Sequence, residues 1–410
     1  MNTYATGEKI VAAQMPLPKG LPGIRMPGEH PKEWILVKLF LYNQVNSAKY
    51  QLNRLLSRNT HKRIALIRHR HLISDAQVFP ILSTTPSAID FKSLDEFIEH
   101  LKKNQTHYDV VLIQCQWNTP PNWLIEKITE IRKLQKNTKV ALLDWYAPLH
   151  IPHTEVIDHI DFYIKKQSFS NIEEYAGIYD TKLTEYEAQW KPEFLDTTHY
   201  RADVTQLKEK LIIGWNFATD RSRITQLNLE LYKNKHRPID IHCRIFAPKD
   251  RNSWYRHMRG RSFDAIQALK QHHGEKFNIL SENKLIIYKK YLQELSRSKI
   301  CLSPFGYGEV CWRDFEAIIG GALLLKPDMA HIQTNPDIFI PFETYIPIKW
   351  DYSDLEEKAL EFLSNESERK RIAENAVYAW RSFLDEGWQS LWSDILRKMS
   401  LDEYGVSKLA

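Results

Sequence analysis

Residues 300–327 of the chain read ICLSPFGYGEVCWRDFEAIIGGALLLKP. This stretch begins with a short apolar run, continues through a turn that holds Gly306 and Gly308, and ends in a second apolar run at residues 322–325. Between the turn and the second run, apolar residues recur at helical spacing until the pair Gly320-Gly321. The pattern predicts a strand, a glycine-bearing loop, a helix and a strand. The backbone N–H groups at the start of such a helix suit an anion, most often a phosphate.

Polar side chains in the expected helix sharpen this interpretation. We expect Glu309 at the helix start, Arg313 one turn later and Glu316 three residues further, so that the three share one face. A carboxylate beside a phosphate loop can accept two hydrogen bonds from a ribose diol, which would let the stretch hold both the phosphates and the ribose of a nucleotide. The alternative is a surface ladder of Glu and Arg side chains, which stabilises a helix by about 0.2–0.5 kcal/mol per pair.

The stretch resembles the C-terminal-domain signature of GT-B glycosyltransferases, in particular the "glycosyl transferases group 1" branch. The similarity lies in Gly306-Tyr307-Gly308-Glu309, in Arg313-Asp314-Phe315-Glu316-Ala317 and in Gly320-Gly321-Ala322-Leu323-Leu324. The resemblance implies that Glu316 binds the ribose of a sugar-nucleotide donor. It also implies that the loop from Gly306 through Tyr307 and Gly308 to Glu309 lies against the donor's phosphates and sugar, with Arg313 beside it. Many members separate the two glutamates by seven residues, whereas this chain separates them by six.

Length and composition set the frame for this resemblance. The chain has 410 residues, more than a single hydrophobic core usually serves, so two domains are expected. A hydrophobic content of 43% and a charged content of 26% are typical of globular proteins. The net charge of +5 is mild for this length and does not indicate a nucleic-acid-binding protein. The four cysteines lack the spacing of a metal site or a disulfide framework, which favours a reducing cytoplasm.

Apolar runs and helical patterns alternate in the first half of the chain. Strands are expected at residues 63–67, 108–115, 139–144 and 160–165, with helices between them. This alternation predicts a parallel, doubly wound sheet.

The third of these strands ends at Asp144. In the resembling family this strand end faces the cleft between the domains and often carries a residue that meets the reacting sugars, and Asp144 is the matching position. His150 and His153 follow in the next loop and are the other candidate bases, although loop histidines are usually only solvated. Geometry must decide among the three.

A second alternating set is expected to begin with a strand at residues 211–214, after a connection at residues 168–207. In the family the loop after this strand approaches the donor phosphates. Arg221 or Arg223 would then pair with the diphosphate, since a planar guanidinium matches phosphate oxygens. A later basic segment would either hold an acidic acceptor or form a solvated helix face; it contains Lys249, Arg251, Arg256, Arg259 and Arg261.

Together these features predict an α/β protein of the GT-B type, with two Rossmann-like doubly wound domains facing across a cleft. We expect an N-terminal arm and helix at residues 1–58, an acceptor-side domain at 59–205, a nucleotide-sugar-binding domain at 206–380 and a terminal helix at 381–410 that packs back on the first domain. Asp144 and Gly308 should line one shared groove that is wide when empty, because ligands of open α/β sheets bind at the carboxyl ends of the strands.

The implied activity is glycosyl transfer, hexosyl or related, from a nucleotide-activated sugar to a glycan or lipid-linked acceptor in the synthesis of surface polysaccharides or glycoconjugates. No cofactor and no metal are expected, because helix dipoles and cationic side chains neutralise the leaving nucleotide in this fold. Two alternatives stay open: a sugar-nucleotide epimerase or hydrolase of the same fold, and a catalytically silent relative that binds sugar nucleotides. The sequence identifies neither the sugar, the nucleobase and the acceptor nor the stereochemistry of transfer.

The N-terminal region bears on location. It lacks the pattern of a signal peptide, and its apolar stretches are too short to cross a bilayer. Residues 32–58 show helical periodicity with basic residues along it, which favours packing on the first domain; the alternative is a helix on a membrane surface. We therefore expect a cytoplasmic enzyme that is able to touch the inner face of a membrane.

Overall fold

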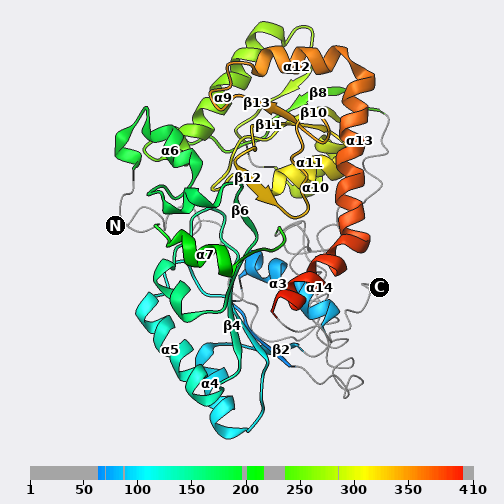
Figure 1. Cartoon of the computed structure of the whole chain (residues 1–410). Helices are drawn as coiled ribbons and strands as arrows, with labels where there is room; N and C mark the ends of the chain where they lie inside the picture. Colours follow the sequence, from blue (N-terminus) through cyan, green and yellow to red (C-terminus); the bar gives the residue numbers. More distant parts are fainter. Residues whose placement is uncertain are drawn as a thin grey trace, which may run out of the picture.

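The computed structural model describes residues 63–69, 71–85, 88–195, 201–216, 236–284 and 286–399. Two separate parallel sheets, each flanked by helices, lie one above the other in Figure 1. The helix expected at residues 32–58 and the side chains of Arg221 and Arg223 lie outside the described residues. Among the described helices, none combines the length and the hydropathy needed to cross a membrane.

The first sheet has six parallel strands in the order β2-β1-β3-β4-β5-β7. These strands are β1 (Ile64–Ile67), β2 (Ala88–Phe91), β3 (Val110–Ile113), β4 (Lys139–Asp144), β5 (Phe162–Lys165) and β7 (Leu211–Ile213). The helices and 3-10 segments of this unit are α3 (Leu72–Thr84), α4 (Leu94–Lys103), α5 (Pro121–Leu134), η1 (Thr154–His159) and α7 (Val204–Lys210). The central strands β1 and β3 are apolar and buried along their whole length, because helices cover both faces of a parallel sheet.

Helix α4 illustrates how local sequence builds this layer. Ser93 caps the helix, since its hydroxyl accepts a hydrogen bond from the backbone N–H of Glu96. The buried side chains recur at helical spacing on one face and pack on the sheet: Leu94, Phe97, Ile98 and Leu101.

The second sheet has five parallel strands in the order β13-β11-β10-β8-β9. They are β8 (Ile239–His242), β9 (Ile279–Leu280), β10 (Ser298–Leu302), β11 (Leu323–Pro327) and β13 (Ile346–Ile348). The helices of this unit are α9 (Trp254–His273), α10 (Tyr288–Ser296), α11 (Trp312–Gly320), α12 (Leu355–Ser364) and α13 (Glu366–Ser382).

The strand, loop, helix and strand predicted for residues 300–327 are confirmed as β10, α11 and β11, with Ile300 paired to Leu323. Gly321 has a φ of 70° and ends α11, a left-handed conformation that glycine adopts without steric cost. The expected helix start was wrong, since α11 begins at Trp312 and Glu309 lies in the loop before it. A capping box between Cys311 and Asp314 fixes the true start.

The strand expected to open the second sheet belongs instead to the first. β7 pairs with β5, with Leu211 opposite Tyr163, and so extends the edge of the first sheet. The first unit thus continues beyond the expected boundary at residue 206. The expected connection is structured: it contains β6 (Gln167–Phe169), η2 (Ile172–Ala176), α6 (Lys182–Ala188), η3 (Pro192–Phe194) and α7.

Three features join the two units. A two-stranded antiparallel ribbon pairs β6 with β12 (Ile332–Thr334). Helix α6 packs against α9, where buried Glu187 meets His257 and where its Oε1 lies 3.6 Å from Nη1 of Arg261. The third feature is the end of the chain, which returns to the first unit.

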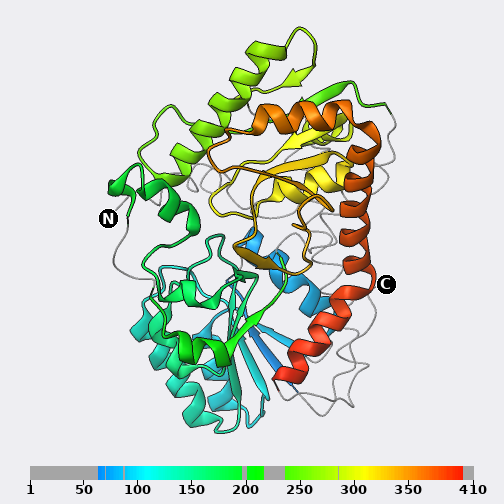
Figure 2. The same cartoon turned by 45° about the horizontal axis from the view of Figure 1, so that its top comes forward.

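Figure 2 shows this return as the orange and red helices that run down one side of the molecule. A short π-helical segment, Phe383–Gly387, links α13 to α14 (Trp388–Lys398). Trp392 of α14 donates a 2.8 Å hydrogen bond from Nε1 to Oγ1 of Thr85, directly after α3. Trp215 packs edge-on against Trp388, with the ring centroids 4.6 Å apart.

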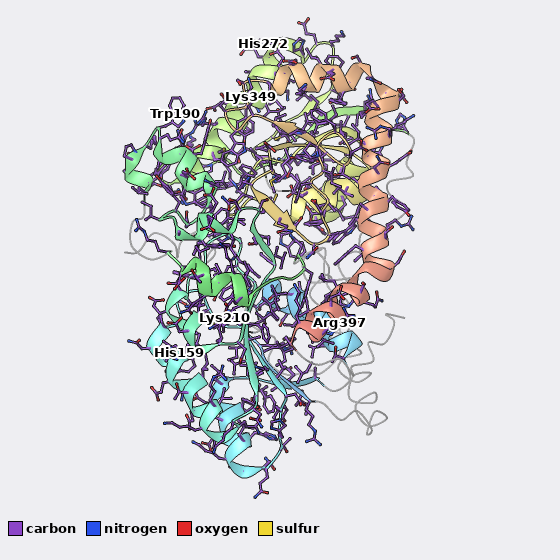
Figure 3. All side chains as sticks on the ribbon, viewed as in Figure 1. His159, Trp190, Lys210, His272, Lys349 and Arg397 are labelled. Atoms are coloured by element: carbon purple, nitrogen blue, oxygen red, sulfur yellow. The ribbon has the colours of Figure 1, made fainter. Side chains whose placement is uncertain are left out.

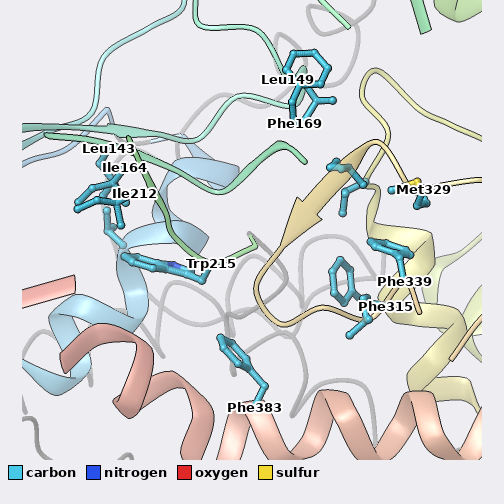
Figure 4. Close-up of a cluster of buried hydrophobic side chains, with 14 of the residues drawn as sticks. Leu143, Leu149, Ile164, Phe169, Ile212, Trp215, Phe315, Met329, Phe339 and Phe383 are labelled. Atoms are coloured by element: carbon cyan, nitrogen blue, oxygen red, sulfur yellow. The ribbon is translucent and has the colours of Figure 1, made fainter. Parts of the chain in front are cut away.

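The buried side chains of both units form one continuous hydrophobic cluster. Figure 4 shows part of it, with Ile212 and Trp215 of the first unit on one side and Phe315 and Phe339 of the second on the other. Two parallel α/β units with a returning terminal helix are the arrangement of the GT-B fold, so the predicted fold class is confirmed.

Candidate functional site

The loop between β10 and α11 touches the first unit at Gly308. A Cβ atom on Gly308 would lie 2.3 Å from the backbone oxygen of Ala147, so no side chain fits there. Ala147 follows β4 and its oxygen accepts a 2.7 Å hydrogen bond from Nε2 of Gln167. The carboxyl ends of the two sheets therefore face each other, but the wide groove expected between them is closed at this point by direct contact.

Asp314 anchors the loop to the helix. Its carboxylate is fully buried and accepts hydrogen bonds from Oγ of Ser303 (2.6 Å), the backbone N–H of Cys311 (2.9 Å) and Nζ of Lys326 (3.1 Å). A buried ion pair of this kind holds its surroundings in one geometry, because the loss of either partner would leave an uncompensated charge. The hydrogen bonds of buried Asp314 therefore fix the conformation of the loop.

Glu316 lies on the side of α11 that faces α10. It is 9% exposed, and its Oε1 accepts a 2.8 Å hydrogen bond from the hydroxyl of Tyr288. The neighbouring Tyr291 has a pKa well above its usual value, because burial and then the charge of Glu316 oppose ionisation of the phenol. Two tyrosines therefore border this carboxylate.

Two guanidinium groups converge on the same loop. Nη1 of Arg313 donates to the backbone oxygen of Pro304 (3.3 Å), and Nη1 of Arg259 donates to that of Phe246 (3.3 Å). Nη2 of Arg259 lies 3.5 Å from the place that a Cβ on Gly306 would take. Burial, followed by the positive charge of Arg313, lowers the pKa of Arg259.

Neither guanidinium forms an ion pair with a carboxylate within the described ranges. Cationic groups in a partly buried place are normally paired, and here two of them repel each other. An anion bound at the Gly306 loop would pair with both guanidinium groups and would offset their mutual repulsion. The sequence singled out Arg259 only as one of five basic residues; its place on α9, directly after the strand next to β10, was the available signal.

Glu309 is fully buried, and among the described residues neither of its carboxylate oxygens has a hydrogen-bond partner. The closest ionisable partner is His331, whose Nε2 lies 3.6 Å from Oε1. Leaving a carboxylate in this state is costly, so the site is suited to a ligand that donates hydrogen bonds to it. Tyr307, two residues before Glu309 in the loop, is 38% exposed and packs edge-on against Tyr255, with the ring centroids 5.4 Å apart.

In the first unit, Asp144 lies at the end of β4, but its carboxylate is buried and already occupied. It accepts hydrogen bonds from Nζ of Lys165 (2.7 Å), the hydroxyl of Tyr163 (2.9 Å) and the backbone N–H of Tyr146 (2.7 Å). Because these three donors occupy its oxygens and the side chain is buried, the carboxylate has no open face toward a sugar. The expectation that Asp144 meets the reacting sugars therefore does not fit its contacts.

The two candidate histidines each lie within hydrogen-bonding distance of a backbone carbonyl oxygen. Burial, with the charge of Lys165, lowers the pKa of His150 to about 3, and its Nδ1 lies 3.2 Å from the backbone oxygen of Asp180. His153 is buried, which lowers its pKa, and Nε2 donates to the backbone oxygen of Gln116 (3.0 Å). Its Nδ1 has no hydrogen-bond partner among the described residues.

The mouth of the first sheet carries aromatic rings that the sequence did not single out as site residues. Trp145 stacks with His69 (5.1 Å) and His71 (5.4 Å), and its Nε1 donates to the backbone oxygen of Cys115 (2.9 Å). Trp117, two residues after Cys115, is 50% exposed. Ring faces of this kind are typical of sugar-binding surfaces.

An open hollow of about 500 Å³ lies at the carboxyl end of β13, with Tyr186 of α6, Lys349 and Trp350 in its wall. Figure 3 labels Lys349 at the border of the second unit. Within the described ranges, no group of three or more His, Cys, Asp or Glu side chains has the geometry of a metal site.

No protein-family model matches the chain, and no curated protein matches it. Solved structures do. TarM is 11% identical, with a TM-score of 0.42 over 75% of this chain and 59% of TarM. A glycosyltransferase from Rickettsia africae is 12% identical, with a TM-score of 0.46 over 84% of this chain and 100% of that one. HepE of Anabaena, in complex with UDP-glucose, is 10% identical, with a TM-score of 0.39 over 83% and 99%. The chain spans only 59% of the length of TarM and 61% of that of the pneumococcal O-GlcNAc transferase GtfA. Its own strand order, facing sheet ends and returning helix make it a protein of the GT-B fold.

Proposed function

We propose that this protein transfers a glycosyl group from a nucleoside-diphosphate sugar bound in the second unit. The observation that carries the proposal is the pair of guanidinium groups, Arg259 and Arg313, which lie beside the Gly306 loop without a carboxylate partner in the described residues. A diphosphate supplies the missing negative charge, and guanidinium forks match its oxygens.

Each neighbouring group has a role in this proposal. Glu316 accepts hydrogen bonds from the ribose diol, and Glu309 accepts them from hydroxyls of the sugar, as the resemblance to GT-B enzymes implies. When the bond between the sugar and the diphosphate breaks, negative charge grows on the leaving phosphate. The fixed guanidinium groups stabilise that charge in a site that water reaches poorly. No metal ion is needed to stabilise the leaving phosphate in this proposal.

For the acceptor we propose a glycan or a lipid-linked glycan at the mouth of the first sheet. Trp145, flanked by His69 and His71, offers ring faces on which a sugar can stack. Synthesis of a surface polysaccharide or glycoconjugate by a cytoplasmic enzyme, in peripheral contact with a membrane, is the setting that follows. UDP-sugars are the first donors to test, since HepE holds UDP-glucose.

A catalytically silent sugar-nucleotide-binding protein is the second candidate. It is favoured by the first unit, where the three candidate bases are engaged or buried: Asp144 by Lys165, and His150 and His153 by burial. Binding of a donor with no turnover in the presence of glycan acceptors would select this candidate. Turnover of a donor without any acceptor would select an epimerase or hydrolase instead.

The experiment is a thermal-unfolding screen of UDP-, GDP-, ADP- and dTDP-sugars, followed by variants. A ligand at one hundred times its Kd stabilises the folded state by about 2.7 kcal/mol, which raises the Tm measurably. We expect Arg259→Ala and Arg313→Ala to abolish that rise, and Glu316→Ala to weaken nucleotide affinity by about tenfold or more, since hydrogen bonds to charged groups are lost.

The matched control is Arg256→Ala on the same helix, because Arg256 is paired with Asp250 at 3.1 Å. It should keep the full rise in Tm. Absence of stabilisation by every sugar nucleotide, or full stabilisation of the Arg259 and Arg313 variants, would contradict the proposed donor site.

A further inference from the structure

His331 and Glu309 form a pair that the loop and its helix do not explain. The carboxylate of Glu309 is fully buried, and Nε2 of His331 is buried as well. The two groups lie 3.6 Å apart, and within the described residues neither Nε2 nor the two carboxylate oxygens form a hydrogen bond. The pair is therefore poised one short movement away from a hydrogen bond, and both oxygens of Glu309 retain their capacity to accept.

The backbone of His331 belongs to the ribbon that joins the units. Its oxygen accepts a 2.9 Å hydrogen bond from the backbone N–H of Ser170, and the oxygen of Ala330 accepts one from Oγ of the same serine (3.0 Å). Strand β12 begins at the next residue and pairs with β6. The position of His331 is consequently set by the contact between the units.

The imidazole ring is held from a second direction. Its centroid lies 5.1 Å from that of Trp350 in an edge-to-face arrangement, and Trp350 makes a similar contact with Phe305 at 5.6 Å. Nε1 of Trp350 donates to the backbone oxygen of Asp328 (2.9 Å). Phe305 directly precedes Gly306, so the same ring packing reaches the start of the loop that carries Glu309.

We infer that His331 is a positioning residue that holds the Glu309 carboxylate against the sugar of the donor and so ties donor recognition to the ribbon between the units. The inference rests on the proposed function, because it needs a sugar at Glu309. An N–H at Nε2 takes one acceptor site of Oε1, fixes the rotation of the carboxylate and leaves Oε2 to accept from a sugar hydroxyl. His331 itself contacts neither the phosphates nor the nucleobase.

The test compares the affinity for a nucleoside diphosphate with that for its sugar ester, using UDP with UDP-glucose and GDP with GDP-mannose as probes. The Kd of the free nucleotide divided by the Kd of its sugar ester measures the contribution of the sugar. In His331→Ala we expect this ratio to fall by about tenfold, as for the loss of a hydrogen bond to a charged group, while the Kd of the free nucleotide stays unchanged. His331→Gln should restore the preference, since its amide N–H reaches the place of Nε2.

A double-mutant cycle separates coupling from general damage. Glu309→Gln should lose the same preference, and His331→Ala combined with Glu309→Gln should be no worse than the weaker single variant, because the two side chains act as a unit. His272→Ala is the matched control: this exposed histidine near the end of α9 (Figure 3) is paired with Glu356, and its substitution should change neither affinity. If His331→Ala does not fold, His331→Leu fills the space without donating, and the same loss is expected.

The outcomes distinguish the two proposals. A wild-type protein that binds neither these probes nor any sugar nucleotide of the thermal-unfolding screen overturns the proposed function and this inference with it. A wild-type protein that prefers the sugar ester, with the same preference in His331→Ala, overturns the inference alone. Additive losses in the double-mutant cycle, or no restoration in His331→Gln, also overturn it.

Discussion

At the scale of single residues, Gly308 is required by contact between the units rather than by the conformation of its own backbone. Any Cβ there would meet the backbone of Ala147, which belongs to the loop after β4. Gly306, two residues earlier in the same loop, has its nearest neighbour for a Cβ at 3.5 Å, an ordinary distance. The two glycines of the signature thus differ in what they exclude.

This difference gives a test of stability. Gly308→Ala should destabilise the protein by about 1–3 kcal/mol, since backbone atoms cannot move aside as a side chain can. Urea unfolding measures the loss, with Gly306→Ala as the matched control that should stay close to the wild type. Equal stability of the two variants would show that the loop and Ala147 do not meet in solution.

Burial of His150 in the first unit should make the folding stability of the protein depend on pH. Its folded-state pKa is lowered to about 3 by burial and Lys165, whereas an unfolded histidine titrates near 6.5. The unfolded state therefore binds more protons between these values, and folding stability should fall as the pH drops from about 6.5 toward 3.

The limiting slope for one such group is about 1.4 kcal/mol per pH unit. We expect His150→Asn, which keeps an amide near the backbone oxygen of Asp180, to make the free energy of unfolding depend less steeply on pH between pH 6 and pH 4. The reduction in slope should be at most that due to one proton, about 1.4 kcal/mol per pH unit. Buried carboxylates contribute equally to both proteins, so the difference between them reports on His150. Identical slopes would mean that the imidazole is accessible to protons in the folded state.

At the scale of elements, α14 joins the two units, as the ribbon of β6 and β12 does near the site. Trp388 and Trp392 are fully buried, and their rings stack at 6.0 Å while both face Trp215 of the first unit. Helix α14 continues from α13 of the second unit, so the contacts of these tryptophans with Trp215 join the hydrophobic cores of the two units.

Trp392→Ala should cost about 3–5 kcal/mol, as truncation of a large buried aromatic residue does. The same substitution at Tyr378, which is 75% exposed on α13, should change stability by less than about 0.5 kcal/mol. Thermal unfolding of both variants checks this pair. A mild effect at Trp392 would mean that the terminal helix is not docked on α3.

At the scale of the whole molecule, the two units are already in contact. Gly308 lies against Ala147, the ribbon bonds β6 to β12, and one hydrophobic cluster runs through both units. Large closure on a donor, common in GT-B enzymes, would have to start from a more open form than this one.

We therefore expect the radius of gyration, measured by small-angle X-ray scattering, to stay constant when the stabilising sugar nucleotide is added. The matched comparison is Gly308→Ala, in which the added methyl group should push the units apart and increase the radius. A clear decrease in the wild type on donor binding would show that the units open in solution.

The sequence by itself determined the parts whose signals are local. The spacing of apolar residues and the glycines of residues 300–327 specify β10, its loop, α11 and β11, because helical and extended periods differ within a few residues. The alternation of such segments likewise required parallel sheets, and it placed Asp144 at the end of a strand.

Only the tertiary structure decided which strands and charges meet. β7 joins β5 instead of opening the second sheet, Arg259 comes from α9 to the side of Arg313, and Lys165 occupies the carboxylate that looked like a base. Each of these contacts joins residues far apart in the chain, and no local period encodes them. They are selected when burial leaves each edge, cation and carboxylate only a few places where its hydrogen bonds and charge are satisfied.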